Sequence, residues 1–128
     1  NERFPDADQV MVLKPENILS CIRPDEQTAF VLMTHNYNYD LHLLKELLAN
    51  NISYIGTLGP KSKLIRMLDE IGISPSEEIN RVYGPVGLDI GAETATEIAV
   101  SIVAEIKAVM TGAMPDFLKN KKAPIHAY

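Results

Sequence analysis

Two nearly unbroken apolar runs constrain the fold of this chain more than any other feature of its sequence. They are "TAFVLMT" at residues 28–34 and "SYIGTL" at residues 53–58. Strands that are apolar on both faces are buried on both, which is typical of a parallel sheet. A short run at 9–13 ("QVMVL") and a weaker one at 81–87 ("RVYGPVG") are candidates for two further strands.

Helical patterns follow these runs. Leucines recur at helical spacing in residues 40–49, and apolar side chains do so again in 61–71, where Gly72 would end the helix. The segment "SPSE" at 74–77 has the form of a capping box at another helix start. Strands that alternate with helices indicate an α/β fold, with a mostly parallel sheet and flanking helices.

The longest helix is expected at residues 95–111, with a capping box formed by Thr94 and Glu97 and with Gly112 at its end. Its polar stripe is narrow and consists of Glu97, Ser101 and Glu105. A helix that is apolar over so much of its surface packs on more than a sheet. We therefore expect it to contact an absent half of the domain or the second copy in a homodimer.

Composition excludes several classes of protein. The 128 residues suit one domain, expected over residues 1–112 with a tail at 113–128. The net charge of -5 argues against nucleic acid as a partner, and no apolar run is long enough to span a membrane. The single cysteine, Cys21, cannot form an internal disulfide, so a reducing compartment, the cytoplasm, is expected. Because its neighbours are apolar, Cys21 is expected to be buried.

A Gly-x-Gly-x-x-Gly turn, with which a nucleotide-binding α/β domain normally opens, does not occur in the sequence. The sequence given opens with "NERFPDADQV" instead. The first Gly-rich βαβ part of a doubly wound domain is therefore expected to be missing, either because this chain never contained it or because the chain is a truncated or cleaved product.

The stretch "YIGTLGPKSK" at residues 54–63 resembles a phosphate loop but does not fit one. A Walker A loop needs Gly-x-x-x-x-Gly-Lys-Ser/Thr, whereas only two residues separate Gly56 from Gly59. Pro60 also lacks the backbone N–H that a phosphate cradle would use. The stretch is better explained as a tight turn from a strand into a helix, with Pro60 at the first helical position.

The lysines of that turn need a further explanation. Cations at a helix N-terminus oppose the helix dipole at a cost of about 0.3–1 kcal/mol each, and Lys61 and Lys63 both fall in the first turn. An anion bound by these lysines, Ser62 and the free N–H groups would offset that cost. Simple exposure of the two lysines to solvent is the alternative.

Two other turns follow strands. In "MTHNYNYD" (33–40), His35 and Asn36 are either a functional pair or a loop-forming pair, and Asp40 is expected to cap the next helix. No spacing there matches a metal-ligand motif, so no metal is expected. In "GPVGLDIGAET" (84–94), Gly87 and Asp89 either contribute to a site or only form the turn and cap. If the strands are neighbours, the three turns converge at one sheet edge.

Three segments together resemble a known family. "FVLMTHNYNYDLHLLKELL", "YIGTLGPKSK" and "GPVGLDIGAETATEIAVSIVAEI" are similar to the C-terminal domain of the xanthine dehydrogenase accessory factor (XdhC/CoxI) family. The resemblance runs in register over about residues 3–110 and is most specific at 85–106. Where the family often has Gly-Ser-Arg this chain has Gly-Pro-Lys at 59–61, and where it often has Thr-Pro-Glu-Glu this chain has Thr-Ala-Thr-Glu at 94–97.

The resemblance implies a Rossmann-like domain and a role in maturing molybdenum hydroxylases of the xanthine dehydrogenase type. Members of the family bind molybdenum cofactor and help to deliver it to the apo-enzyme, which implies binding and handover rather than turnover. The ligand's phosphate would be held at the 56–63 turn and its heterocycle at 35–36, and no catalytic residue is assigned. The expected cofactor-binding residues are His35, Asn36, Gly56, Gly59, Lys61, Ser62, Lys63, Gly87 and Asp89. The alternatives are an NAD(P)-dependent oxidoreductase domain and a non-catalytic dimerisation module.

Overall fold

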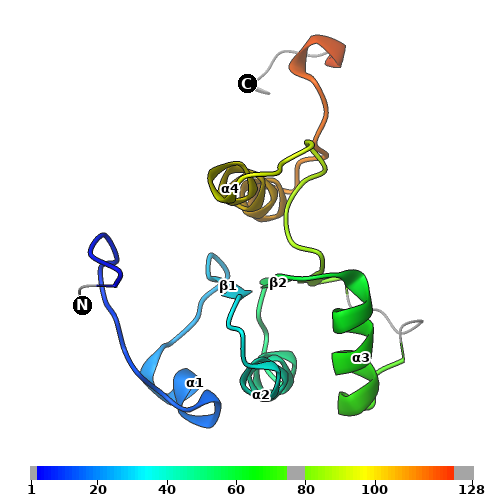
Figure 1. The fold of residues 1–128 in the computed structure, drawn as a ribbon. Coiled ribbons are helices and arrows are strands. Elements are labelled where there is room, and N and C mark those ends of the chain that lie inside the picture. Colours follow the sequence, from blue (N-terminus) through cyan, green and yellow to red (C-terminus); the bar gives the residue numbers. More distant parts are fainter. Residues whose placement is uncertain (1–2, 75–79, 123–128) are drawn as a thin grey trace. The chain divides into compact units, whose positions relative to one another are not determined.

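A parallel sheet of three strands organises the first part of the chain (Figure 1). In the computed structural model, which describes residues 3–74 and 80–122, β1 (Ala29–Leu32), β2 (Tyr54–Thr57) and β3 (Val82–Tyr83) lie in the order β1-β2-β3. Both strand pairs are parallel, with Phe30 opposite Ile55 and Ile55 opposite Val82. The predicted parallel α/β fold is confirmed.

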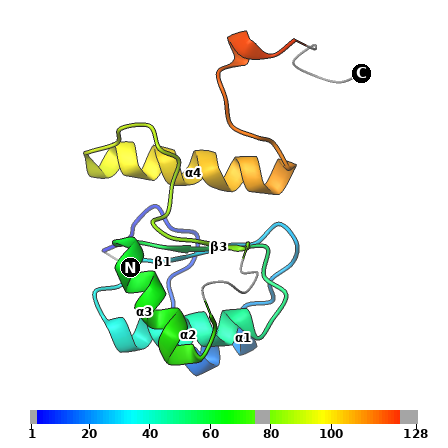
Figure 2. The ribbon, with the colours of Figure 1, turned by 90° about the vertical axis from the view of Figure 1, so that its right-hand side faces the viewer.

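Two helices cover one face of this sheet. Within the first unit of the chain, residues 1–85, α2 (Tyr37–Leu48) and α3 (Lys61–Ile71) lie on the same side of the strands (Figure 2). Apolar side chains from both helices and from β1 and β2 form a single buried cluster. This core comprises Leu32, Leu43, Leu44, Leu47, Ile52, Ile55, Leu64, Met67 and Leu68.

The bounds of α3 agree with the sequence pattern, and Gly72 ends this helix with φ 94°. The apolar spacing of Leu64, Ile65, Leu68 and Ile71 predicts the buried side of α3, but Ile65 is 43% exposed and Met67 is buried in its place. The helix α2 starts at Tyr37, earlier than the leucine pattern indicates. The predicted capping box at 74–77 falls largely outside the described residues.

The N-terminal segment departs from prediction. Residues 9–13 form no strand, and Val12 is 95% exposed, so this run neither pairs with β1 nor enters the core. The chain instead forms two short turns of helix, η1 (Pro15–Asn17) and α1 (Ile18–Cys21). Cys21 is exposed, and its predicted burial is wrong because Ile18 and Leu19 of the same turn face the core instead.

The second unit, residues 86–128, contains α4 (Ala95–Thr111) and the short η2 (Leu118–Asn120). Both hydrogen bonds of the capping box formed by Thr94 and Glu97 are present, and Gly112 ends α4 with φ 71°. The helix bounds and both ends are therefore as predicted. None of the helices in the described part of the chain is long and apolar enough to cross a membrane.

The polar stripe of α4 forms hydrogen bonds with the segment that precedes this helix. The carboxylate of Glu105 accepts a hydrogen bond from the Gly87 N–H at 3.0 Å, and the Ser101 carbonyl accepts one from Leu88 N–H at 3.2 Å. Ser101 is only 3% exposed, whereas Val100 and Val103 are 57% and 66% exposed. The segment that leads into α4 thus covers part of the stripe, and apolar side chains of α4 remain at the surface.

Candidate functional site

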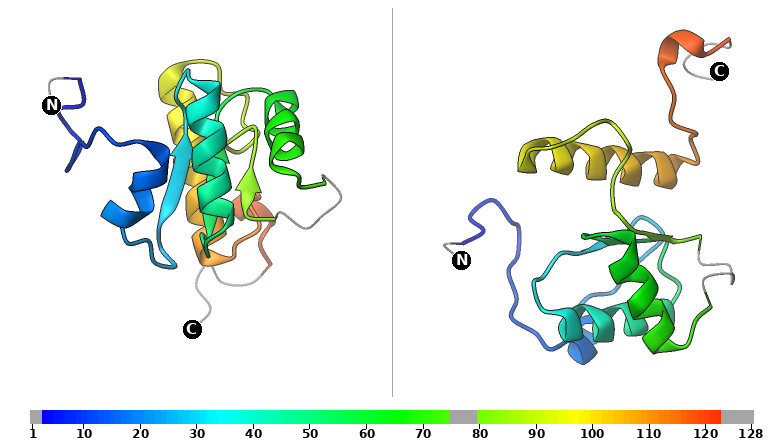
Figure 3. Two further views of the ribbon diagram at one scale, coloured as in Figure 1. Left: turned by 90° about the horizontal axis from the view of Figure 1, so that it is seen from below. Right: turned by 45° about the vertical axis from the view of Figure 1, so that its right-hand side comes forward.

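The carboxyl ends of β1 and β2 bring two of the predicted turns together. Because these strands are parallel neighbours, the segments that follow them, 33–36 and 58–60, leave the same edge of the sheet (Figure 3). The backbone ladder continues into the second turn, where the Leu58 N–H donates to the Leu32 carbonyl at 3.0 Å. The expected convergence is thus confirmed for these two turns.

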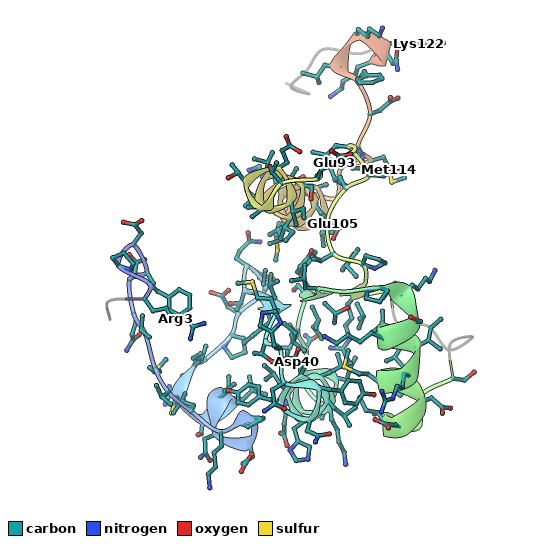
Figure 4. All side chains as sticks on the ribbon, viewed as in Figure 1. Arg3, Asp40, Glu93, Glu105, Met114 and Lys122 are labelled. Carbon is teal, nitrogen blue, oxygen red and sulfur yellow. The ribbon has the colours of Figure 1, made fainter. Side chains whose placement is uncertain are left out.

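A buried carboxylate lies directly beneath this edge. Asp40 belongs to α2, is labelled in Figure 4 and is 1% exposed. Its Oδ1 accepts a hydrogen bond of 2.7 Å from Thr34 Oγ1. Its Oδ2 is buried, has no hydrogen-bond partner and lies 3.7 Å from Lys63 Nζ. One oxygen is therefore anchored to the end of β1, and the other faces the start of α3.

The predicted capping role of Asp40 is wrong. The N-cap of α2 is Asn36, whose Oδ1 accepts from the Tyr39 N–H at 3.1 Å. Asp40 lies four residues further along, where the helix turns it inward. A sequence signal for this existed, because Asp40, Leu44 and Leu47 follow the i, i+4, i+7 spacing of the buried face.

Lys63 folds back over the turn that precedes it. Its Nζ lies 3.4 Å from the Leu58 carbonyl, and its side chain is 27% exposed. Gly59 has φ 117°, and a Cβ there would lie 3.2 Å from Lys63 Cδ. The glycine therefore permits both the left-handed backbone of the turn and the path of the lysine stem across it.

The start of α3 is electropositive. Pro60 is the N-cap rather than the first helical residue, and it makes no side-chain cap. The first turn contains no acidic residue, while Lys61 and Ser62 are exposed at its outer side. In this turn the Lys63 N–H already donates to the Pro60 carbonyl at 3.0 Å. Free N–H groups at a helix start, together with nearby ammonium groups, suit an anion.

The remaining residues of the first unit divide between surface and sheet. His35 is exposed at the start of α2, and the side chain of Asn36 serves as the cap. Gly56 lies inside β2, opposite Val31 and Tyr83, so it belongs to the strand rather than to the turn. A residue that the sequence did not single out is Gly84, where a Cβ would lie 2.4 Å from Thr57 Oγ1. This glycine lets the end of β3 approach the end of β2.

A second contact joins α2 to α3. Tyr37 Oη donates a hydrogen bond of 2.8 Å to Glu70 Oε2, and the Arg66 guanidinium lies 4.4 Å from the centre of the Tyr37 ring. Burial, followed by the hydrogen bond and the charge of Glu70, raises the pKa of Tyr37, against an opposing effect of Arg66. The phenol therefore stays protonated and joins the start of α2 to α3.

Gly87 and Asp89 belong to the second unit. Gly87 has φ 106°, and a Cβ there would lie 2.4 Å from Ser101 Oγ, so the loop needs glycine to reach α4. Asp89 is exposed. Among residues 3–74 and 80–122, no group of three or more His, Cys, Asp or Glu side chains could hold a metal ion.

Comparison with known families identifies the fold. Residues 1–106 match the family described as the XdhC Rossmann domain. The chain belongs to this family. The XdhC Rossmann domain seen here is also similar to the crystal structure described as a xanthine dehydrogenase from Bacillus halodurans, with a TM-score of 0.74 and 34% identity over 88% of this chain and 33% of the other.

Two curated relatives carry names that bear on function. The XdhC domain is 42% identical over 103 residues to a Bacillus subtilis protein named as a probable xanthine dehydrogenase subunit, covering 80% of this chain and 30% of that protein. It is 33% identical over 88 residues to the molybdenum cofactor insertion chaperone PaoD of Escherichia coli, covering 66% and 27%. The sequence given thus spans about a third or less of each relative, and the predicted Rossmann-like family is confirmed.

Proposed function

We propose that this XdhC domain is part of an accessory factor that matures a molybdenum hydroxylase of the xanthine dehydrogenase type. It binds molybdenum cofactor, or a related ligand that carries phosphate, and aids its insertion into the apo-enzyme. The observation that carries the proposal is the family match over residues 1–106, together with a relative named as a molybdenum cofactor insertion chaperone.

The side chains at this edge of the sheet support a ligand-binding role rather than a catalytic one. Lys61 and Ser62 are exposed at the start of α3, and Lys63 is held over the preceding turn. These groups would hold the ligand's phosphate, because ammonium groups and N–H groups at a helix start complement negative charge. His35, exposed in the turn between β1 and α2, would contact the heterocycle together with Asn36. The ligand is cargo, so the protein would release it unchanged.

Gly87 and Asp89 are proposed separately as cofactor-binding residues. Both precede α4 in the second unit. Gly87 has a defined structural role in the contact with Ser101 and Glu105, and the exposed Asp89 is the residue of this pair with a side chain available to a ligand.

We also propose a cytoplasmic homodimer as the working form. The exposed Val100 and Val103 on α4 support an interface with a second copy, since apolar side chains on neighbouring turns favour burial. Size-exclusion chromatography with light scattering measures the oligomeric state. A monomer at micromolar concentration would contradict this part of the proposal.

Direct binding tests the function. Isothermal titration of molybdopterin into the full-length protein should show binding, and the Lys61→Ala/Lys63→Ala variant should bind at least about tenfold more weakly, a loss of about 1.4 kcal/mol. Lys45→Ala is the matched control, because Lys45 lies in the last turn of α2, away from the carboxyl ends of the strands. Unchanged affinity in the double variant would contradict the assignment of the turn.

The same titration separates the alternatives. NAD(P)H binding with hydride transfer would show that the protein acts as an oxidoreductase and not as a chaperone. If neither ligand binds to the full-length protein, a dimerisation module becomes the better explanation. Handover is tested by the activity that apo molybdenum hydroxylase gains when it is mixed with the ligand-loaded protein, which should exceed the gain with free cofactor.

A further inference from the structure

We propose that Asp40 is the positioning residue of this site, because it holds the Lys63 ammonium over the turn between β2 and α3. This inference rests on the proposed function, since it concerns how Lys63 is presented to a ligand's anionic group. Asp40 itself is buried and would not touch the ligand.

The first step of the argument is the burial of an incompletely bonded carboxylate. Oδ1 of Asp40 is satisfied by Thr34, but Oδ2 has no hydrogen-bond partner. A buried carboxylate oxygen without a partner is costly, and buried charges are retained where they are paired or functional. The group that it faces is Lys63 Nζ, at 3.7 Å. The carboxylate is thus placed to attract this ammonium from below.

The second step is the incomplete bonding of the lysine. An ammonium group has three donors, and the contacts of Lys63 Nζ are long, 3.4 Å to the Leu58 carbonyl and 3.7 Å to Asp40. Its side chain is 27% exposed, so one side of the lysine side chain is open to solvent. The lysine is therefore held in place without using up its donors, and a phosphate oxygen could accept from the open side.

The third step is the difference between the two lysines. Lys61 is exposed, and among the described residues no contact holds its ammonium, whereas Lys63 is drawn back by Asp40 across Gly59. A lysine fixed in advance loses less side-chain entropy when a ligand binds. Lys61 would supply long-range attraction, and Lys63 would supply a donor in a defined place.

Two opposite effects of removing the Asp40 charge make the inference testable. If Asp40 acted only as a nearby negative charge, Asp40→Asn would strengthen anion binding. If it positions Lys63, the same change weakens binding, because the lysine moves into solvent. Asn keeps the volume and can still bond Thr34, so the fold is expected to persist. Glu46→Gln, which removes an exposed carboxylate from α2, is the matched control for net charge.

The experiment uses the full-length protein and inorganic pyrophosphate as the probe. We expect Asp40→Asn to bind pyrophosphate about tenfold more weakly, with Glu46→Gln unchanged or slightly tighter. Reductive methylation read by mass spectrometry should show Lys63 reacting several-fold faster in Asp40→Asn, with Lys61 unchanged. Thr34→Val, which removes the hydroxyl that anchors Oδ1, should give an intermediate effect on both.

The outcomes distinguish this inference from the proposed function. Equal Lys63 labelling in wild type and Asp40→Asn, or tighter pyrophosphate binding in the variant, would overturn the positioning role while leaving the anion site in place. Lack of pyrophosphate binding by the wild type would instead overturn the anion site, and the Lys63 labelling would still decide the Asp40 contact.

Discussion

The two long helices that follow glycine-containing turns begin in opposite ways. α4 starts with a complete capping box, in which Thr94 and Glu97 satisfy backbone N–H groups. α3 starts at Lys61, and its N-cap Pro60 makes no side-chain cap. The first turn of α3 has no acidic residue and carries Lys61 and Lys63. At the start of α4, side chains of the chain itself cap the helix. At the start of α3 no side chain does so, although the Lys63 N–H donates to the Pro60 carbonyl at 3.0 Å.

This difference has an energetic meaning. Caps and first-turn acids stabilise a helix, and first-turn cations oppose its dipole. A chain that optimises one helix start and leaves the other unfavourable keeps a positively charged position at the edge of its sheet. The comparison therefore favours a ligand role at α3 and a structural role at α4, and the following predictions test it from the largest effect to the smallest.

The largest effect is expected at the turn before α3. Gly59→Ala should destabilise the protein by roughly 1–3 kcal/mol, because alanine is strained at φ 117° and its Cβ would crowd the Lys63 stem. Urea denaturation measures the free energy of unfolding. Gly91→Ala is a control with positive φ, 71°, and open space around its Cβ, so it should cost less. Equal costs would show that the Lys63 stem adds no constraint.

The cap of α4 should show a smaller effect on stability alone. Thr94→Ala removes the acceptor of the Glu97 N–H bond and should cost about 1 kcal/mol. Hydrogen exchange at the first turn of α4 measures this loss directly. Pyrophosphate affinity should stay at the wild-type value, and a fall in affinity would contradict the division of roles between the two helix starts.

Reversing the charge of Lys61 at the start of α3 should stabilise the fold and abolish pyrophosphate binding. Lys61→Glu replaces a cation by an anion at a helix start and should stabilise the protein by roughly 0.3–1 kcal/mol, while pyrophosphate binding is lost. Thermal unfolding and titration calorimetry measure the two effects. Lys45→Glu, in the last turn of α2, should have the opposite sign for stability. A destabilised Lys61→Glu variant would argue that Lys61 is structural.

The smallest effect is a pH dependence confined to α4. Hydrogen bonds from the Glu93 and Thr94 N–H groups lower the pKa of Glu97 below 4.5. A lowered pKa stabilises the folded state above pH 4.5, and this contribution is lost as the pH falls through the lower, folded value. Hydrogen exchange in the first turn of α4 should increase over that range, and Glu97→Gln should remove the dependence.

Much of the fold could be predicted because it depends on local patterns. The bounds of α3 and α4 follow from apolar spacing and from glycines at their ends. The run at residues 9–13 looks apolar enough for a strand, but a strand needs a neighbour to pair with, and apolar character alone does not supply one. The prediction that Cys21 is buried failed for a similar reason, since only one side of a short helical turn faces the core.

The sequence by itself determined the parallel α/β class, the positions of α3 and α4 and the unusual start of α3. It did so because strand burial, helix periodicity and capping are written in neighbouring residues. Only the tertiary structure decided that Asp40 lies beneath the strand ends, with Thr34 on one side and Lys63 on the other. That arrangement depends on the parallel pairing of β1 with β2, which brings together segments more than twenty residues apart.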